Sequence, residues 1–236
     1  MPYRSFDAQL TAASNPICNK PPGTSIDDIL TAVLPCDNGG AGTVTGPAGW
    51  SHVTGSPLNS GSDGQTLFVM QKKAGGAEPS TYQFTNNQGD PMRLWILAHS
   101  GEDPAAFLHR VSALVSSTTF NSTWNMLSAA FGSVTTAICD LIFIGSNDTA
   151  TGGTLTHTPP GGFTEKVDDS DAGKLDVEIA IQDSVGAGAT GSLTGTGSQT
   201  PSVTTAPMVI VIALAQAVAG ASAPPPDAQR ATLLCM

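Results

Sequence analysis

Histidine, serine and carboxylate side chains are the residues of this chain that could carry out catalysis or hold a metal. The four histidines form no HxH, HExxH or HxxxH pattern; they are His52, His99, His109 and His157. Such spacing matters because metal ligands must converge on one ion. No GxSxG turn of the hydrolase type is present either. We therefore assign no catalytic, cofactor-binding or metal-binding residue, interpret each histidine as a loop or surface residue, and predict that the protein is not an enzyme.

One acidic segment resembles a calcium-binding loop. Residues 168–173 read DDSDAG, but Ser170 and Ala172 would occupy ligand positions, and no bidentate glutamate closes a twelve-residue loop. We interpret this segment as a hairpin turn.

The aromatic residues offer a second kind of site, a platform on which a sugar ring could stack. Trp50 and Phe163 each end a Pro-x-Gly-aromatic turn, and a large aromatic at such a position more often closes the end of a β-sandwich. We interpret both as scaffold residues. Trp124 lies in a polar run, which makes it the better candidate for a partner contact.

The cysteines show no CxxC spacing, which excludes zinc-ribbon and thioredoxin motifs. Cys139 lies in an apolar run and is expected to be a buried thiol. Cys18 and Cys36 could form a bridge, but we favour reduced thiols in a protein that assembles in a cytoplasm.

The fold prediction depends on a loose internal repeat. Five features occur twice in the same order: an acidic residue opening an apolar strand, a Pro-x-Gly-aromatic turn, a Gly-led strand, a Thr-rich strand and a strand that begins with Pro-Met. The two copies span about residues 26–100 and 138–215. They predict an all-β fold, an antiparallel, jelly-roll-like β-sandwich built from two copies of one β-unit, within a single domain at 26–222.

Two strand patterns predict what covers the sheets. Residues 174–182 alternate apolar and polar side chains, so one face should be buried and the other should meet water. Residues 94–97 and 208–212 are apolar on both faces, so another element or a partner subunit must cover them. A short helix predicted at 101–110, with an acidic start and a basic end, could cover one of them.

Both ends of the chain are predicted to be extended arms. Residues 1–25 contain Asn15-Pro16 and Pro21-Pro22-Gly23 and few apolar side chains, which favours an irregular arm. Residues 223–236 begin with a proline run and end in an apolar tip, a candidate docking segment with Leu233, Leu234 and Met236 as contact residues. A frayed terminus is the alternative.

Composition excludes two classes of partner. The net charge is −10, and the nine Lys and Arg residues form no stripe, so binding to nucleic acid is not expected. The longest apolar run, residues 206–221, contains Pro207, Gln216 and Gly220 and is too short and too interrupted for a membrane helix. Only 12% of residues are charged, which indicates that much of the surface is covered by other protein.

Several segments resemble a pattern found in virion proteins of tailed bacteriophages. They are the strand start at Asp27-Asp28, the turn ending at Trp50, and residues 72–74, 78–85 and 95–101. The resemblance covers roughly residues 24–215; the family commonly has Gly-Asp where this chain has Asp27-Asp28. It implies a β-sandwich structural protein attached to the phage head or tail, with no known catalytic role.

The sequence and this resemblance together lead to a functional hypothesis. We expect a non-enzymatic capsid decoration, or cement, protein on the outer surface of the virion, which binds the major capsid protein and copies of itself, most simply as a homotrimer. The alternative is a tail or fibre module that recognises a host glycan through Trp50 or Trp124. A hydrolase whose site assembles only in space is a third hypothesis that no motif supports.

Overall fold

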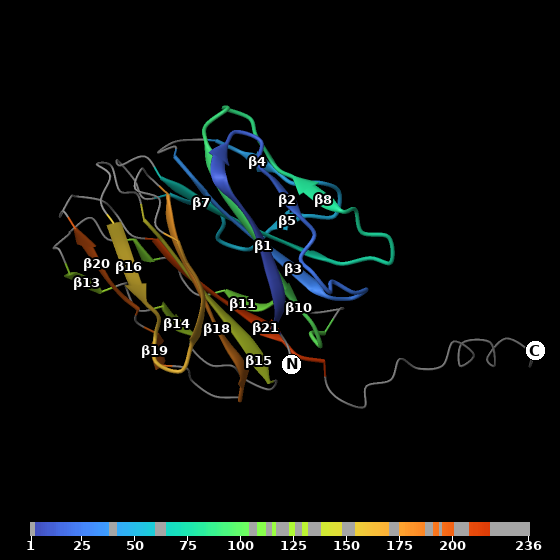
Figure 1. Cartoon of the computed structure of the whole chain (residues 1–236). Coiled ribbons are helices and arrows are strands. Elements are labelled where there is room, and N and C mark those ends of the chain that lie inside the picture. The colour runs from blue at the N-terminus through green and yellow to red at the C-terminus, as the bar shows by residue number, and fades with distance from the viewer. Residues whose placement is uncertain are drawn as a thin grey trace, which may run out of the picture.

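The computed structural model describes residues 3–37, 42–59, 65–103, 108–111, 115–116, 123–125, 129–131, 138–147, 154–169, 175–186, 191–193, 195–200 and 208–217. Two six-stranded antiparallel sheets dominate this part of the chain (Figure 1). The predicted all-β class with antiparallel sheets is confirmed.

Sheet 1 is formed by the N-terminal half of the chain. Its order is β1 (Tyr3–Ala13), β10 (Met92–His99), β3 (Ile29–Cys36), β7 (Thr66–Lys73) and β5 (Ser51–His52), and β6 (Leu58–Asn59) also pairs with β7. Two small sheets accompany it: β2 (Ile17–Asn19) with β8 (Thr81–Gln83), and β4 (Val44–Thr45) with β9 (Thr85–Asn86).

Sheet 2 is formed by the C-terminal half. Its order is β11 (Leu108–Val111), β21 (Met208–Ala215), β15 (Cys139–Asn147), β18 (Asp176–Val185) and β17 (Thr164–Asp169), and β12 (Val115–Ser116) also pairs with β21. Its small sheets are β13 (Thr123–Asn125) with β20 (Thr196–Thr200) and β16 (Thr154–Thr158), and β14 (Ala129–Phe131) with β19 (Gly191–Leu193).

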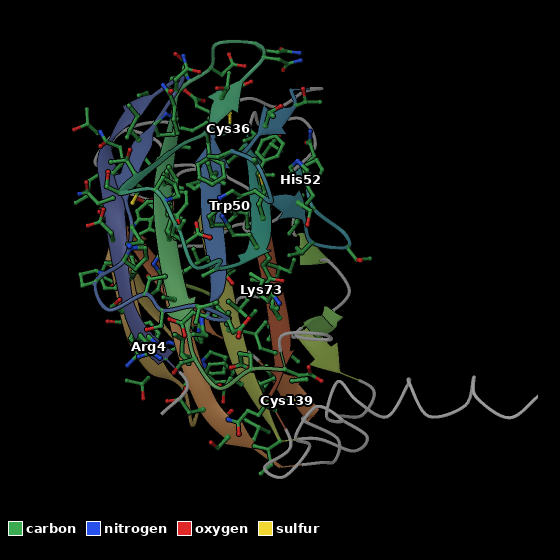
Figure 2. All side chains as sticks on the ribbon, turned by 90° about the vertical axis from the view of Figure 1, so that its right-hand side faces the viewer. Arg4, Cys36, Trp50, His52, Lys73 and Cys139 are labelled. Carbon is green, nitrogen blue, oxygen red and sulfur yellow. The ribbon has the colours of Figure 1, made fainter. Side chains whose placement is uncertain are left out.

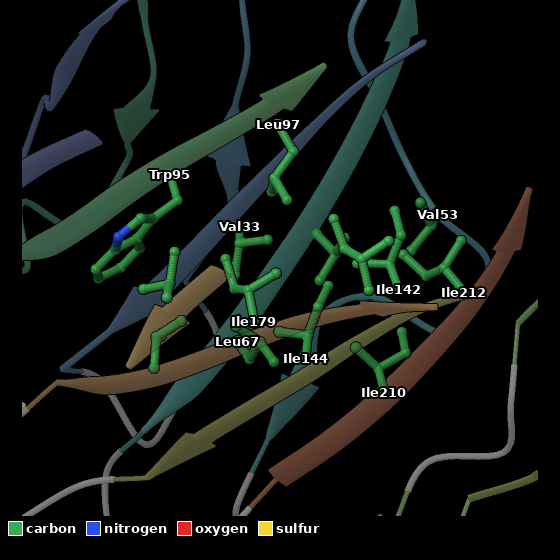
Figure 3. Packing of buried hydrophobic residues seen from close by; sticks show 14 of the residues in the cluster. Val33, Val53, Leu67, Trp95, Leu97, Ile142, Ile144, Ile179, Ile210 and Ile212 are labelled. Carbon is green, nitrogen blue, oxygen red and sulfur yellow. The ribbon is translucent and has the colours of Figure 1, made fainter. Parts of the chain in front are cut away.

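The two large sheets share one apolar core. Figure 3 shows Val33, Trp95 and Leu97 of sheet 1 beside Ile144, Ile179 and Ile210 of sheet 2. Within each strand these residues alternate with others that point away, as the pleat requires. Burial of such large aliphatic side chains from both sheets stabilises the pairing of the sheets through the hydrophobic effect.

The outer faces of the sheets are covered by the chain itself. The outer face of sheet 1 includes Leu94 and Ile96, which are buried in a cluster with Trp50, Tyr82 and Phe84. The outer face of sheet 2 includes Val209 and Val211, which are buried in a cluster with Leu193 and partly buried Phe163. The doubly apolar strands therefore have cover from their own chain and give no argument for a partner subunit.

The prediction that the polar face of residues 174–182 meets water was wrong. Asp176, Glu178 and Ala180 are fully buried, although they alternate with the inward-pointing Val177 and Ile179. Strand β16 lies near this face, because its His157 contacts Asp168 of β17, the neighbour of β18. Alternation shows that the two faces differ in polarity, but it does not reveal whether a third layer covers one of them.

Two other predictions differ from the structure. Residues 3–13, expected in an irregular arm, form β1, which pairs with β10 from Tyr3 to Ala13, so no boundary at residue 25 separates them from the sheet. Pairing with β10 overrides the weak strand propensity of this segment. The helix at 101–110 is not confirmed: Leu108–Val111 form a strand and Glu102 a bridge to Gln216, while residues 104–107 lie outside the described ranges.

A buried arginine joins the two sheets. Arg93 of β10 donates from Nε to the Leu10 carbonyl in sheet 1 (2.7 Å), from one terminal nitrogen to the Leu175 carbonyl (3.0 Å), and from the other to the Asp169 carboxylate (2.7 Å) beside sheet 2. The guanidinium also stacks on Trp95 at 5.1 Å. Because only 4% of the Arg93 side chain is exposed, its charge is stable there only with these partners in place.

Arg93→Met should destabilise the protein by about 3 kcal/mol, since the Leu175 carbonyl and the Asp169 carboxylate both lose a charged donor. Denaturant unfolding followed by tryptophan fluorescence measures the change. Lys73→Met is the matched control, because Lys73 pairs with Asp27 at the surface, where ion pairs contribute below about 1 kcal/mol. Equal losses for the two variants would show that Arg93 does not hold the sheets together.

Candidate functional site

Trp50 lies in the core rather than on the surface. Its indole packs edge-to-face on Tyr82 (5.5 Å) and Phe84 (5.1 Å), and 9% of the residue is exposed. Figure 2 shows Trp50 over the strands of sheet 1. A Cβ atom on Gly46 would come within 2.7 Å of the Trp50 Cβ, so the turn fits closely around the indole. In this position Trp50 is not available to stack on a sugar.

Phe163 ends a turn of the same shape. The Phe163 amide donates to the Pro160 carbonyl (3.1 Å), as the Trp50 amide donates to the Pro47 carbonyl (3.2 Å). The glycine before each aromatic is left-handed, with φ of 89° at Gly162 and 88° at Gly49, a conformation that favours glycine. Phe163 packs on Phe143 with ring centroids 6.0 Å apart. Both turn aromatics thus cover the outer face of a sheet.

The other predicted contact residues are placed only in part. The backbone of Trp124 pairs with Gly197 in β13 and β20, and its side chain is outside the described set. Leu233, Leu234 and Met236 lie outside the described residues. The role of these four residues in a partner contact therefore stays a prediction.

Two of the four histidines contradict the prediction that all are loop or surface residues. His99 is fully buried in β10, and burial lowers its pKa to about 3, so its ring is neutral. His157 in β16 is also buried, and its Nδ1 lies 2.9 Å from Asp168 Oδ1. His52 lies in β5 with its Nε2 3.0 Å from the Val44 carbonyl, and of His109 only the backbone is described. Each of the three described rings thus lies in a strand.

The most unusual electrostatic feature is a pair of buried carboxyl groups where the chain crosses from sheet 1 to sheet 2. Glu102 is 3% exposed, and Asp140 at the start of β15 is fully buried. Asp140 Oδ1 accepts from the Ser184 amide (2.7 Å) and from Gln216 Nε2 (2.8 Å). Among the described residues no N–H or O–H group donates to either Glu102 oxygen or to Asp140 Oδ2. One proton shared between the two groups would supply the missing donor.

Burial, the hydrogen bond to Asp140 and the negative charges of Asp140 and Asp183 raise the pKa of Glu102 to about 10. Glu102 therefore holds the shared proton at neutral pH. Backbone hydrogen bonds hold the segment around Glu102 against the end of β21. The Asp103 amide donates to the Ala215 carbonyl (2.8 Å), and the Ala217 amide donates to the Gly101 carbonyl (2.9 Å). The carboxyl pair thus lies where the segment that leaves β10 meets the end of β21, next to Gln216, which bridges to Glu102 and donates to Asp140.

A second buried acid lies on the outer face of sheet 2. Glu178 is fully buried, and burial together with the charges of Glu165 and Asp168 raises its pKa to about 8. Asp168 is directly opposite Glu178 in the ladder and also contacts His157. A carboxyl group with a raised pKa beside a histidine is a pattern of acid–base sites. However, the Glu178 carboxyl is closed to solvent, so this arrangement gives a substrate no access to it.

The described thiols are suited to packing rather than to chemistry. Cys18, Cys36 and Cys139 are free and buried. Burial raises the pKa of Cys139 to about 11 and that of Cys36 to about 12, so neither forms the thiolate that a nucleophile or a metal ligand requires. Within the ranges that the structure describes, no group of three or more His, Cys, Asp and Glu side chains could hold a metal ion.

Comparison with known proteins gives no further guide to function. No protein-family model matches the chain, and neither a curated protein nor a solved structure matches it. The described part of the chain contains no helix long and apolar enough to cross a membrane.

The buried carboxyl pair was not predictable, because Glu102 and Asp140 are 38 positions apart and their surroundings are set by the crossover. The only sequence signal is that each flanks an apolar strand. Trp50 and Phe163 were found because the same short turn occurs twice.

Glu102→Gln should raise the melting temperature, and the gain over the wild type should widen as pH rises from about 6 to about 9. The folded protein keeps a proton on Glu102 up to a pKa of about 10, whereas the unfolded chain releases it near the ordinary glutamate pKa of 4.5. The contribution of Glu102 to the free energy of unfolding is therefore fully present at low pH and falls as the pH rises. An amide can donate to Asp140 without any proton uptake.

Calorimetry across this pH range measures the effect, and Asp27→Asn, a change at a carboxylate that is 54% exposed, is the control. A wild-type curve parallel to that of Glu102→Gln would contradict the shared proton.

Proposed function

We propose that this protein is a non-enzymatic structural component of a bacteriophage virion, most specifically a decoration protein bound to the outside of the assembled capsid. One observation carries the proposal. Five large hydrophobic residues are exposed in the described part of the chain, and four of them lie within its first 26 residues. They are Phe6, Leu10, Ile17 and Ile26, with Ile138 as the fifth. We propose that the four side chains of the N-terminal segment belong to one protein-binding surface, the role that contiguous exposed apolar surface has in other proteins.

The internal repeat supports a scaffold role. We propose that the protein is a β-sandwich of two copies of one unit, because both sheets have the same strand order: β1-β10-β3-β7-β5 corresponds strand by strand to β11-β21-β15-β18-β17. The two Pro-x-Gly-aromatic turns have matching geometry as well. A fold whose outer faces are sealed by its own loops leaves the edges and the N-terminal segment to contact other proteins.

The residues that correspond between the proposed copies follow from the core and not from the acidic residues that open the strands. Aligning Asp28 with Asp140 would set the inward-facing Val33 opposite Gly145. Val33 pairs with Val69 and Trp95, and Ile144 pairs with Ile179 and Ile210, so Val33 corresponds to Ile144. A shift of one residue exchanges the faces of a strand, and the core decides which alignment holds.

The mechanism is mass action. A protein that binds only the assembled shell stabilises that shell by its binding free energy. Many copies on one particle make even modest contacts effective. The proposed partners are the major capsid protein and further copies of this chain. A homotrimer would suit the local threefold axes of a shell, and this number comes from lattice geometry rather than from residues.

Replacing exposed apolar residues of the N-terminal segment should lower the number of copies bound per head. We expect Ile17→Lys and Ile26→Lys, at side chains 48% and 64% exposed, to weaken binding about tenfold each, since a lysine must lose water in the contact. Ile138→Lys, at a side chain 52% exposed elsewhere, should leave binding unchanged. Quantitative gels of purified heads mixed with each variant give the occupancy.

Cryo-electron microscopy of the same particles decides the location. Many copies on symmetry axes of the head, with residues 3–26 against a neighbour, would support the proposal. A few copies at the tail and none on the head would replace it with a tail component, for which Trp124 is the residue to test for sugar binding.

A further inference from the structure

The edge of sheet 1 at β1 is unlike the other edges of the two sheets. Within the described residues β1 pairs only with β10, so the backbone groups along its opposite side have no strand partner. An exposed edge is a template for pairing with another chain, and proteins usually protect such edges with lysine, proline, bulges or short strands. β1 is 11 residues long and contains neither lysine nor proline.

The other three edges carry those protections. β17 has four charged residues among its six, TEKVDD, and an irregular register next to Lys166. β5 and β6 have two residues each. The edge at β21 is divided between β11, with four residues, and β12, with two. Among the edges that the structure describes, β1 is the longest; its register with β10 is regular from Ser5 to Gln9 and irregular between Tyr3 and Ser5 and between Gln9 and Ala13.

The two charged residues of β1 are already engaged within the molecule. Arg4 Nε lies 2.8 Å from Asp28 Oδ2, and the Asp7 carboxylate accepts from the Asn19 amide (2.8 Å) and the Cys18 thiol (3.1 Å). Neither charge is left to repel an incoming strand. Phe6 and Leu10, which are 38% and 52% exposed, remain as apolar side chains along the edge.

The sequence of β1 is nearly symmetric about its middle. Residues 5–11 read SFDAQLT, so around Ala8 the pattern runs hydroxyl, apolar, polar, alanine, polar, apolar, hydroxyl. In an antiparallel pair centred on Ala8, residue i faces residue 16 − i of the other strand. Phe6 then faces Leu10 on one side of the pleat, Asp7 faces Gln9 on the other, and Ser5 faces Thr11. No like charges oppose each other, which is the condition for favourable cross-strand pairs.

We propose that β1 is the site at which a second copy of this chain binds, by antiparallel pairing of the two β1 strands about a twofold axis at Ala8. A twofold contact uses the same surface on both partners and therefore needs a self-complementary strand, which residues 5–11 provide. The alanine at the axis is small enough for two copies to meet there, where Ala8 already packs against the inter-sheet core. Main-chain hydrogen bonds give the affinity, and the Phe6–Leu10 pairs fix the register.

This inference rests on the proposed function in one respect, since it names which of the two proposed partners, the shell or another copy, meets β1. The twofold contact between β1 strands is also distinct from the threefold contact that would hold the proposed homotrimer together. Pairs of β1 strands could link neighbouring oligomers across the twofold axes of a lattice.

Sedimentation of the purified full-length protein over a range of concentrations tests the association. We expect wild-type protein to self-associate, and Leu10→Lys to weaken this association at least about tenfold with little change in melting temperature. Ile138→Lys is the matched control, because the Ile138 and Leu10 side chains are both 52% exposed. An association that both variants weaken equally, or wild-type protein with no association that depends on β1, would overturn the inference.

Crosslinking tests the register. In a Cys235→Ser background, which leaves only the buried thiols of Cys18, Cys36 and Cys139, a mixture of Phe6→Cys and Leu10→Cys should form a disulfide-linked dimer under mild oxidation. Each variant alone should not, because its two introduced thiols would lie four residues apart, about 13 Å along the strands. Equal crosslinking of a single variant with itself, or none in the mixture, would exclude pairing centred on Ala8.

The two proposals fail in different ways. Loss of head binding by Ile17→Lys with no β1 pairing in solution would keep the decoration function and discard the self-pairing. Self-pairing by a protein absent from particles would do the reverse.

Discussion

The Arg93 guanidinium is the polar contact on which the arrangement of the two sheets depends. Apolar packing brings the sheets together but tolerates sliding, whereas two directed hydrogen bonds from Arg93, to the Leu175 carbonyl and the Asp169 carboxylate, fix their relative position. The same guanidinium holds the edge strand β1 through the Leu10 carbonyl and continues the core through Trp95. Because water is excluded from this site, an unpaired charge there has no alternative partner. Each of these hydrogen bonds therefore contributes more to stability than it would at the surface.

The fold also determines where function can reside. Each sheet has one face in the shared core and the other beneath its own loops, with Trp50, Tyr82 and Phe84 over sheet 1 and Phe163 and Leu193 beside sheet 2. The buried acids Glu102, Asp140 and Glu178 are enclosed in the same layers. Carboxyl groups with perturbed pKa values in an open cleft are a pattern of catalytic sites, whereas these three are buried. The contact surfaces that we propose are the exposed edge at β1 and the N-terminal segment.

The sequence predicted the elements better than their surroundings. Alternation and apolar runs located β3, β7, β10, β15, β18 and β21, and the repeated turn identified Trp50 and Phe163, because these signals are local. The cover over Glu178, the strand at residues 3–13 and the burial of His99 depend on contacts between distant segments, which leave no local pattern. The residue correspondence within the proposed repeat is hidden for a related reason: glycines and acidic residues mark strand ends, but only core packing fixes which face points inward.

If the two sheets are copies of one unit, their differences show where the unit has acquired separate roles. The ladder sets Trp95 against Val33 and Ile210 against Ile144, so Arg93 corresponds to Met208, which lies in the shared core. One copy therefore supplies the charged connection between the sheets, and the other supplies an apolar side chain. The edge strands diverge in the same way, with a continuous β1 in sheet 1 and the separate β11 and β12 in sheet 2. Among the described strands, β1 is the one long open edge, and it gives a duplicated sandwich one defined direction in which another strand can add; two such edges would allow unlimited growth.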